Sequence, residues 1–279
     1  MLFEELCFNY YSKINFQALL VPNDSNFFEL LNIKIFKKLS KPSFLFLHGL
    51  PSRYSTYDEV NTDYLVVWGE KIKDNYVKCG FDPNKIIVSG HPLYTNFKSN
   101  QLRFDTTDVL IVTKGLNGSQ YRERTVVSDR GNLITYLMSI QDVLRNYGVI
   151  SARLRVHPSE NFDWYKKHID CAFFIQDNSS LENSLKRATI VIGPTSTIFL
   201  EALYKGVNYI VYEPIIDQID MSGYKVVNPF DGSDERVPVA KNTNDLSYIL
   251  KSKISVNPDV FYDYIQKDFK TEFLNQLVY

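Results

Sequence analysis

Three histidines stand directly after short apolar runs that are typical of strands, and this placement suggests chemistry. They are His48 in FLFLHGLP, His91 in VSGHPLY and His157 in LRVHPSE. An imidazole changes its charge near neutral pH, so it can donate to a phosphate or take a proton from a hydroxyl group. One histidine at such a place is more often structural, but three at equivalent places make a functional role an equally good interpretation. His91 precedes Pro92 and can instead fix a turn.

The sharpest local motif is VIGPTSTIFLEALYKG, residues 191–206. An apolar run is followed by Gly-Pro, by the hydroxyl residues Thr195, Ser196 and Thr197, and then by a helical pattern. Free backbone N–H groups, hydroxyls and the positive end of a helix dipole would bind an anion there. Capping of the helix explains one hydroxyl, but not three. Glu201, one turn further along, is a candidate acceptor for a ribose hydroxyl.

A second candidate for anion binding is VTKGLNGSQYRER, residues 112–124. Gly115 follows a predicted strand and lets the backbone approach a ligand closely, while Lys114, Arg122 and Arg124 supply positive charge. The alternative is a surface loop. Neither G-x-x-x-x-G-K-[ST] nor G-x-G-x-x-G occurs, which argues against a phosphate-loop ATPase and against a dinucleotide oxidoreductase.

Acidic residues lie in the long segment RYSTYDEVNTD, between His48 and the next predicted strand. Loops of this length inside compact domains are often functional. Asp58 and Glu59 are therefore candidate bases beside His48. The alternative is that these carboxylates, with Asp63, are only solvated.

The secondary structure that must position these residues can be predicted from the sequence pattern. Short apolar runs alternate with longer segments of helical period, which is typical of parallel α/β folds. Ligands bind beyond the carboxyl ends of the strands in such sheets. The pattern forms two sets and predicts strands at 16–21, 43–49, 64–69, 85–90, 108–113, 151–158, 171–176, 189–193 and 208–213, with helices at 3–13, 24–39, 69–79, 131–147, 161–168, 179–187 and 196–205.

The polar stretch 94–108 lacks any apolar period and follows Gly90-His91-Pro92, so the domain boundary is expected there. Residues 1–94 would form a first Rossmann-like domain on the acceptor side, short for its type, and residues 95–256 a second domain that binds the nucleotide donor. The pattern of residues 257–279 predicts an aromatic amphipathic helix. This helix could return to the first domain or cover its own sheet.

The composition limits the partners. Thirty-one Lys and Arg against 32 Asp and Glu give a net charge of −1, so no global field attracts nucleic acid. Three cysteines without C-x-x-C spacing argue against a disulfide framework or a zinc site. The N-terminal residues contain no long apolar run, which favours a cytoplasmic protein. Peripheral contact with the inner face of the membrane and homo-oligomer formation both stay open.

The segments FLHGLP, GHPLY, LRVHPSE and GPTSTIFLEALYKGVNYIVYEP together resemble the GT-B glycosyltransferases of bacterial surface-polysaccharide synthesis. They are similar to the sialyltransferase and polysialyltransferase group and to the CDP-glycerol glycerophosphotransferases, which carry an HP motif followed by a Ser/Thr pair. The resemblance implies a fold of two Rossmann-like domains with a cleft between them. It also implies that His157-Pro158 and Ser196-Thr197 hold the phosphate of a CMP-sugar donor.

In the glycerophosphotransferases an HG motif resembles His48-Gly49, and its histidine is the proposed base. The acid triplet of the sialyltransferases does not occur in this sequence, and Gly-Pro-Thr-Ser-Thr stands in place of Asp-Tyr-Ser-Ser. The base therefore stays open between His48, Asp58 and Glu59.

The resemblance implies transfer of a sugar from a nucleotide-activated donor, with a CMP-sugar of sialic-acid type favoured, in capsule or lipopolysaccharide synthesis. The acceptor would be a saccharide or a lipid-linked saccharide. Such transfer needs donors to the leaving phosphate and a base for the acceptor hydroxyl. No D-x-D motif occurs, so we expect neither a metal nor another cofactor. Three alternatives are a CDP-glycerol-type glycerophosphotransferase, a UDP-sugar epimerase and a non-catalytic nucleotide-sugar-binding subunit.

Overall fold

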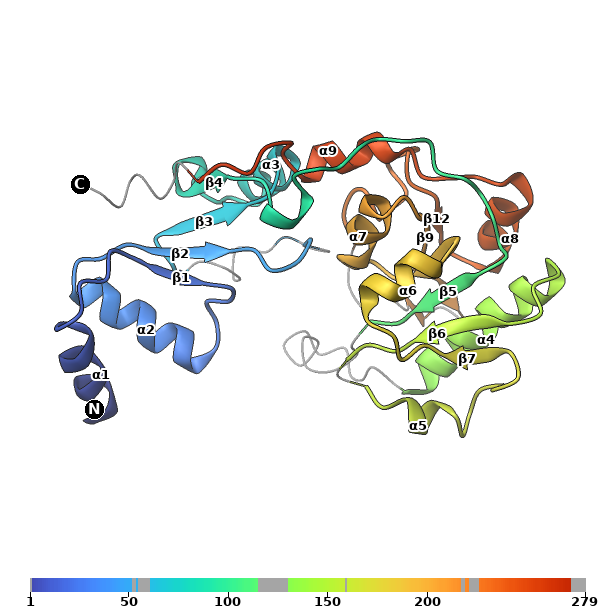
Figure 1. Ribbon diagram of the computed structural model, residues 1–279, viewed down its shortest axis with the longest axis horizontal. Helices are drawn as coiled ribbons and strands as arrows, with labels where there is room; N and C mark the ends of the chain where they lie inside the picture. The colour runs from blue at the N-terminus through green and yellow to red at the C-terminus, as the bar shows by residue number, and fades with distance from the viewer. Residues whose placement is uncertain are drawn as a thin grey trace. The chain divides into compact units, whose positions relative to one another are not determined.

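The computed structural model describes residues 2–51, 54, 61–114, 130–158, 160–216, 219–220 and 226–271. The chain forms two compact units, which Figure 1 shows in colours that follow the sequence. Unit 1 comprises residues 1–97 together with 261–279, and unit 2 comprises residues 98–260.

Unit 1 is a parallel sheet whose four described strands follow the order of the chain, β1-β2-β3-β4. Because the order never reverses, this sheet has no topological switch point within its described strands. Its strands are β1 (Leu19–Val21), β2 (Ser43–Phe46), β3 (Tyr64–Val67) and β4 (Ile86–Val88), and its helices are α1 (Leu2–Tyr11), α2 (Phe27–Lys38), α3 (Glu70–Lys78), α9 (Phe261–Tyr264) and the 3₁₀ turns η1 (Pro83–Lys85) and η2 (Pro92–Tyr94).

Aromatic and β-branched side chains hold unit 1 together. Phe44 on β2 lies opposite Tyr64 on β3, and their rings stack with centroids 5.1 Å apart. Trp68, directly after β3, is buried, and its indole N–H donates to the Leu47 carbonyl at 2.9 Å. The ends of β2 and β3 are therefore joined at the edge of the sheet where His48 follows.

Unit 2 is a parallel sheet in the order β12-β9-β8-β5-β6-β7. The chain runs outward from β5 to β7, returns to β8 beside β5, and then runs outward the other way, so the switch point lies between β5 and β8. Its elements are β5 (Val109–Val112), α4 (Arg130–Asn146), β6 (Ala152–Arg155), α5 (Phe162–Tyr165), β7 (Phe174–Gln176), α6 (Leu181–Arg187), β8 (Ile190–Gly193), α7 (Ile198–Tyr204), β9 (Asn208–Tyr212), the ribbon β10 (Ile215–Ile216) and β11 (Ile219–Asp220), β12 (Val239–Ala240), α8 (Thr243–Ser252) and η4 (Pro258–Val260).

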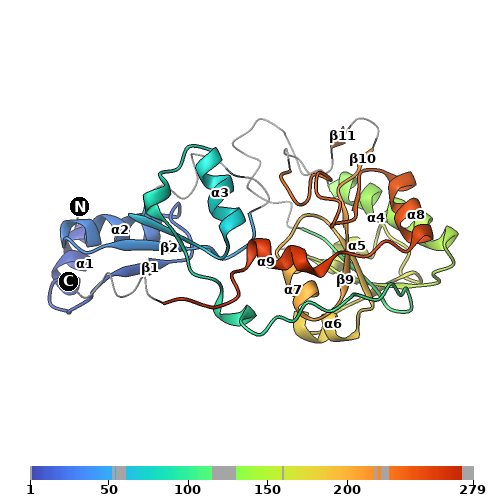
Figure 2. The same ribbon diagram turned by 90° about the horizontal axis from the view of Figure 1, so that it is seen from above.

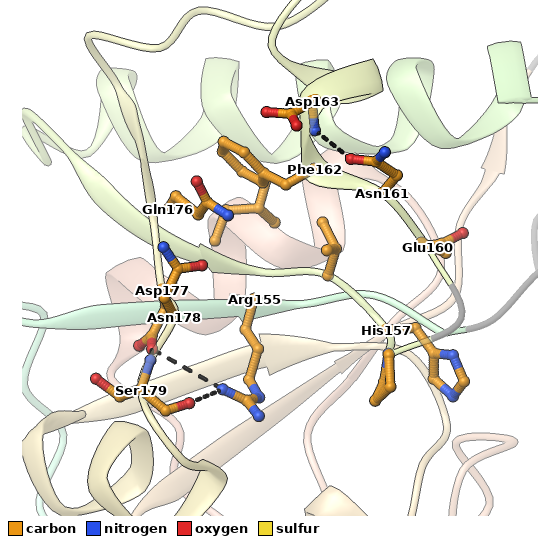
Figure 3. A pocket seen from close by; sticks show the side chains of 13 residues that line it. Arg155, His157, Glu160, Asn161, Phe162, Asp163, Gln176, Asp177, Asn178 and Ser179 are labelled. Carbon is orange, nitrogen blue, oxygen red and sulfur yellow. Dashed lines mark hydrogen bonds and ion pairs between the residues drawn. The ribbon is translucent and has the colours of Figure 1, made fainter.

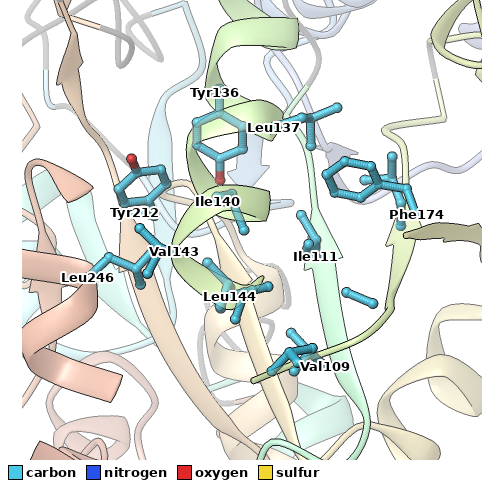
Figure 4. Close-up of a cluster of buried hydrophobic side chains, with 14 of the residues drawn as sticks. Val109, Ile111, Tyr136, Leu137, Ile140, Val143, Leu144, Phe174, Tyr212 and Leu246 are labelled. Atoms are coloured by element: carbon cyan, nitrogen blue, oxygen red, sulfur yellow. The ribbon is translucent and has the colours of Figure 1, made fainter. Parts of the chain in front are cut away.

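Helices cover both faces of the unit 2 sheet, as Figure 2 shows with α4 and α8 on one side and α6 and α7 on the other. Every residue of β8 and β9 is buried, which is expected of central parallel strands. Figure 4 shows the core between the sheet and the first pair of helices. This core includes Val109, Ile111, Leu137, Ile140, Leu144, Tyr212 and Leu246.

The predicted fold of two Rossmann-like α/β domains is confirmed, and each predicted strand and helix from 3 to 213 has a counterpart in the structure. The short strand β12, the helix α8 and the ribbon β10–β11 were not predicted. Among the described residues, no helix combines the length and the apolar character that a bilayer crossing requires.

The expectation of one continuous helix over 257–279 was wrong for its described part. Helix α9 ends at Tyr264, and residues 265–271 are not helical. Their backbone instead binds the ends of unit 1 strands, since Gln266 N–H donates to the Trp68 carbonyl at 2.8 Å and Lys270 N–H to the Ser89 carbonyl at 2.7 Å. Residues 272–279 lie outside the described part of the chain.

Glycine makes this attachment possible. A Cβ atom on Gly69 would lie 2.5 Å from the carbonyl carbon and oxygen of Tyr264, so only glycine lets the end of α9 approach the residues after β3 this closely. Tertiary hydrogen bonds thus replace the helical ones that the amphipathic pattern predicted.

Candidate functional site

The switch point of unit 2 brings together residues that follow three neighbouring strands. Thr113-Lys114 follow β5, Pro194-Thr195 follow β8, and Glu213 follows β9. The Thr195 backbone N–H donates to Glu213 Oε1 at 2.7 Å, and Lys114 Nζ lies 3.2 Å from each oxygen of the same carboxylate. Lys114 and Thr195, two predicted site residues, are therefore joined through Glu213, which the sequence analysis did not identify.

The turn after β8 is closely packed and depends on glycine. A Cβ atom on Gly193 would lie 2.2 Å from Val112 Cγ2 and 2.5 Å from the Tyr209 hydroxyl. That hydroxyl donates to the Pro194 carbonyl at 2.6 Å and fixes the turn. The motif Gly-Pro therefore has a structural reason in addition to its place beside the site.

The three hydroxyl residues of this turn have different environments. Thr195 is 4% exposed, and its Oγ1 is buried without a hydrogen-bond partner among the residues that the structure describes. Ser196 Oγ accepts from the Ile198 N–H, the first amide of α7, at 3.3 Å. Ser196 and Thr197 are half-buried. Thr197 is the N-cap residue of α7, and its side chain makes no capping hydrogen bond.

His157 lies directly beyond β6, and the backbone positions it. Its N–H donates to Thr113 Oγ1 at 2.9 Å, and the Thr113 hydroxyl donates in turn to Glu160 Oε2 at 3.0 Å. Tyr165 in α5 donates to the same Glu160 oxygen at 2.8 Å. The side chain of His157 is exposed. The backbone of His157 therefore anchors its loop to the end of β5.

A cavity of about 570 Å³ opens beyond the carboxyl ends of β6 and β7. Figure 3 shows His157 at one edge of it and Gln176 and Asp177 on the other side. Its volume suits a small ligand of nucleoside size. Side-chain amides, which can both donate and accept, are prominent in its lining, namely Asn161, Gln176 and Asn178.

A buried ion network includes Asp177, which lines this cavity. Arg153, 8% exposed, donates to Asp108 Oδ1 at 2.6 Å, to Asp177 and to the Ser184 carbonyl at 3.0 Å. Burial by itself would raise the pKa of Asp177. Hydrogen bonds from the Ser184 hydroxyl and the Ser179 N–H, with the charge of Arg153, outweigh burial and hold that pKa below its ordinary value.

Glu201 lies in α7 and is half-buried. Burial raises the pKa of its carboxyl above the ordinary value, while the charges of Arg155 and Lys205 oppose this shift. The Arg155 side chain also lines the 570 Å³ cavity, where it donates to the Ser179 carbonyl at 2.6 Å. The charge of Arg155 thus acts both on the cavity that it lines and on the Glu201 carboxyl.

His48 belongs to unit 1, where it follows β2 and is exposed. Its Nδ1 lies 2.7 Å from the Pro22 carbonyl oxygen. Because a carbonyl can only accept, Nδ1 carries the proton of the neutral ring and Nε2 keeps the lone pair. This is the tautomer that a general base at Nε2 requires.

His91 is structural, as its place before Pro92 suggested. Its Nδ1 accepts from the Leu93 N–H at 3.2 Å, and its ring packs 4.7 Å from Trp68 and 4.6 Å from Tyr94. Burial lowers the pKa of His91 to about 4. The ring is therefore neutral at pH 7 and fixes the turn after β4.

The other predicted residues have three different outcomes. Asp63 is structural, because its Oδ2 accepts from the Ser43 N–H at 2.8 Å and from the Ser43 hydroxyl at 2.7 Å. Pro158 is exposed on the wall of the cavity. Asp58, Glu59 and Gly115 lie outside the described residues.

The chain matches no family model, and no curated protein matches it by sequence. Its fold is similar to that of the UDP-GlcNAc 2-epimerase from Methanocaldococcus jannaschii in complex with UDP-GlcNAc and UDP, with a TM-score of 0.62 and 16% identity over 99% of this chain and 79% of that one. For the UDP-GlcNAc 2-epimerase from Neisseria meningitidis bound to UDP-GlcNAc, the TM-score is 0.58 and the identity 12%, over 99% and 78% of the two chains. For TarM the values are 0.54 and 12%, over 98% of this chain and 57% of TarM. At these identities the likeness shows a common fold of two Rossmann-like domains.

Proposed function

We propose that the chain is a glycosyltransferase that uses a nucleotide-activated sugar, with a CMP-sugar of sialic-acid type as the favoured donor, in the synthesis of a bacterial capsule or lipopolysaccharide. One observation carries this proposal. Three neighbouring strands at the switch point of unit 2 end beside predicted site residues: β5 before Lys114, β6 before His157, and β8 before the hydroxyls of residues 195–197. Doubly wound sheets bind nucleotides at such a switch point.

In this proposal the phosphate of the donor binds His157, Ser196 and Thr197. The nucleoside occupies the 570 Å³ cavity, where amide side chains can pair with the edge of the base. Glu201 accepts a hydrogen bond from the ribose. The leaving phosphate gains charge in the transition state, so these donors lower the barrier more than they strengthen ground-state binding.

His48 is the proposed base, since its Nε2 keeps the lone pair in the tautomer described above. It would take the proton of the acceptor hydroxyl as the glycosidic bond forms. Asp58 and Glu59 remain alternative bases. The acceptor is a saccharide or a lipid-linked saccharide.

A UDP-sugar 2-epimerase is the second candidate, because proteins of this fold include epimerases that bind UDP-GlcNAc. The test is incubation with CMP-, CDP-, UDP- and GDP-sugars, with and without saccharide acceptors, while free nucleotide and sugar stereochemistry are followed. A transferase releases nucleotide from one donor, an epimerase changes the sugar of a UDP donor, and a binding subunit only gains thermal stability from the ligand. A melting temperature that no nucleotide shifts would contradict both enzymatic candidates.

The two proposed half-sites should fail differently when they are mutated. The double substitution Ser196→Ala and Thr197→Ala is expected to weaken nucleotide binding by about 1–3 kcal/mol, the usual range for hydrogen bonds to a charged group. His48→Ala is expected to leave nucleotide binding nearly unchanged and to lower kcat, because a base acts in the transition state. Titration calorimetry and initial rates measure the two effects.

Ser252→Ala, which removes an exposed hydroxyl at the end of α8, is the matched control for binding. Asp58→Asn and Glu59→Gln, assayed beside His48→Ala, identify which group takes the proton. Loss of nucleotide binding in His48→Ala, together with normal binding in the double variant, would reverse the proposed roles of the two units.

A further inference from the structure

Exposed apolar side chains gather in one short part of unit 1. Fifteen large apolar side chains are exposed in the described part of the chain, and nine of them lie between residues 3 and 30. Single exposed apolar residues are ordinary on a protein surface, but a concentration of them marks a surface that contacts something other than water. The helix α1 carries the most regular group of these side chains.

This group forms one stripe along α1, the α1 stripe. Phe3, Leu6 and Tyr10 are 54%, 57% and 63% exposed, and their spacing of three and four residues places them on one face of the helix. Another side of α1 packs on α2, where the Tyr11 ring lies 5.9 Å from the Phe36 ring (Figure 1). A helix that packs through one side normally has a polar outer face. Because α1 is apolar on both, its outer face suits an apolar surface.

Lysines lie beside the α1 stripe. Lys34 and Lys38 on α2 share the single carboxylate of Glu4, and their side chains are 60% and 51% exposed. This cluster therefore keeps one net positive charge. Lys13, just beyond the end of α1, and Lys37 on α2 are also exposed. The apolar stripe is thus accompanied by cations that reach into solvent.

The charge of this part of the chain differs in sign from that of the whole. Residues 1–41 contain five lysines and four acidic residues, whereas the full chain has a net charge of −1. One of the four acids, Asp24, is buried and accepts the backbone N–H groups of Asn61 and Thr62. Five lysines therefore face three carboxylates at the surface of this segment, and the complementary partner is anionic.

An anionic lipid bilayer fits both the apolar stripe and the charge. A helix that lies in the bilayer interface presents Phe and Leu to the acyl chains and lysines to the headgroups. The lysine stems can lie along apolar surface while their charges stay in water. A second copy of this chain fits less well, because a two-fold contact would bring two net-positive surfaces together.

We infer that the α1 stripe docks on the surface of an anionic lipid bilayer. The contact is peripheral and uses the outer face of α1 with the neighbouring lysines. This inference goes beyond the proposed function and does not depend on it. A lipid-linked saccharide, one of the two acceptor classes of the proposed function, would be presented at such a surface.

The test is cosedimentation of the full chain with two kinds of vesicle, one of phosphatidylcholine alone and one of equal parts phosphatidylcholine and phosphatidylglycerol. We expect the wild type to partition about tenfold more strongly onto the anionic vesicles. The triple variant Phe3→Gln, Leu6→Gln and Tyr10→Gln keeps good helix formers in α1 but removes the apolar stripe. Its partitioning onto anionic vesicles should fall by about tenfold or more.

Two further variants separate charge and general exposure from the stripe. Lys13→Gln with Lys37→Gln should lower partitioning onto anionic vesicles by about tenfold and leave that onto neutral vesicles unchanged. The matched control removes three exposed apolar side chains of unit 2, by Met138→Gln, Ile150→Gln and Tyr248→Gln, and should bind vesicles as the wild type does. Nucleotide binding by the triple α1 variant should also equal that of the wild type, so the proposed function is tested separately.

The inference would be overturned if the wild type bound neither kind of vesicle, or bound both equally. A triple α1 variant that is folded by circular dichroism and still partitions as the wild type does would also overturn it. If the wild type sediments as a dimer and the triple variant as a monomer, the stripe is a contact between copies and the inference is wrong. Should the triple variant not fold, Tyr10→Gln alone, with an expected loss of about threefold, decides the question.

Discussion

Arg153→Met is expected to lower the free energy of unfolding by about 3–5 kcal/mol, the usual cost of removing one partner from a buried ion pair. Arg153 is 8% exposed and holds Asp108, Asp177 and the Ser184 carbonyl. Methionine fills most of the same volume but leaves the Asp177 carboxylate buried without its main counter-charge. Urea unfolding followed by circular dichroism measures the loss.

The pH dependence distinguishes lost charge from lost packing. In the wild type the lowered pKa of Asp177 stabilises the fold above the ordinary carboxyl pKa, and this contribution disappears as the pH falls through the folded value. Without Arg153 the pKa of Asp177 should rise, so as the pH falls the variant protonates Asp177 and no longer buries an unpaired charge. The difference in free energy of unfolding between wild type and variant should therefore narrow from pH 7 to pH 4. A constant difference would point to packing alone.

Arg145→Met provides the matched control. Arg145 also pairs with an aspartate, Asp170 at 2.5 Å, but its side chain is 51% exposed. Solvent screens such a pair, so its removal should cost far less than the removal of Arg153. Equal losses in the two variants would contradict a special role for the buried network.

His157→Ala is expected to reduce turnover about a hundredfold if the imidazole contacts the leaving phosphate, in line with the loss of one preorganised donor. The bond from the His157 N–H to Thr113 Oγ1 should persist in this variant, because it comes from the backbone. The reduction should appear mainly in kcat, with a smaller effect on nucleotide affinity. Steady-state rates and calorimetry on the same preparations separate these quantities.

His168→Ala is the control for the loss of an exposed histidine in unit 2. Thr113→Val tests the anchoring of the His157 loop, because it removes the hydroxyl that accepts a hydrogen bond from the His157 N–H and donates one to Glu160. We expect His168→Ala to retain wild-type turnover and Thr113→Val to lose part of it. Normal turnover in a folded His157→Ala variant would show that His157 is structural.

The sequence by itself determined the elements and the residues at their ends. Apolar runs of strand length, turn residues and helical periods are local features, so the alternation predicted parallel sheets and placed His48, His157 and Thr195 after strands. The two-residue strand β12 was too short to give a periodic signal. The sequence did contain a start signal for helix α8, because asparagine is a preferred N-cap residue. In the structure Asn242 caps this helix and accepts from the Asp245 N–H at 2.9 Å.

Only the tertiary structure decided which of these residues meet. The order β12-β9-β8-β5-β6-β7 places the ends of β5 and β8 side by side, and no local pattern encodes that order. Glu213 reaches Lys114 across 99 residues of sequence, so an acid directly after a strand gave no sign of its partner. Residues 265–271 likewise bond to the Trp68 and Ser89 carbonyls and do not form the helix that their pattern predicted. In residues 265–271, long-range hydrogen bonds to the carbonyls of buried residues replace a local helix preference of less than about 1 kcal/mol per residue.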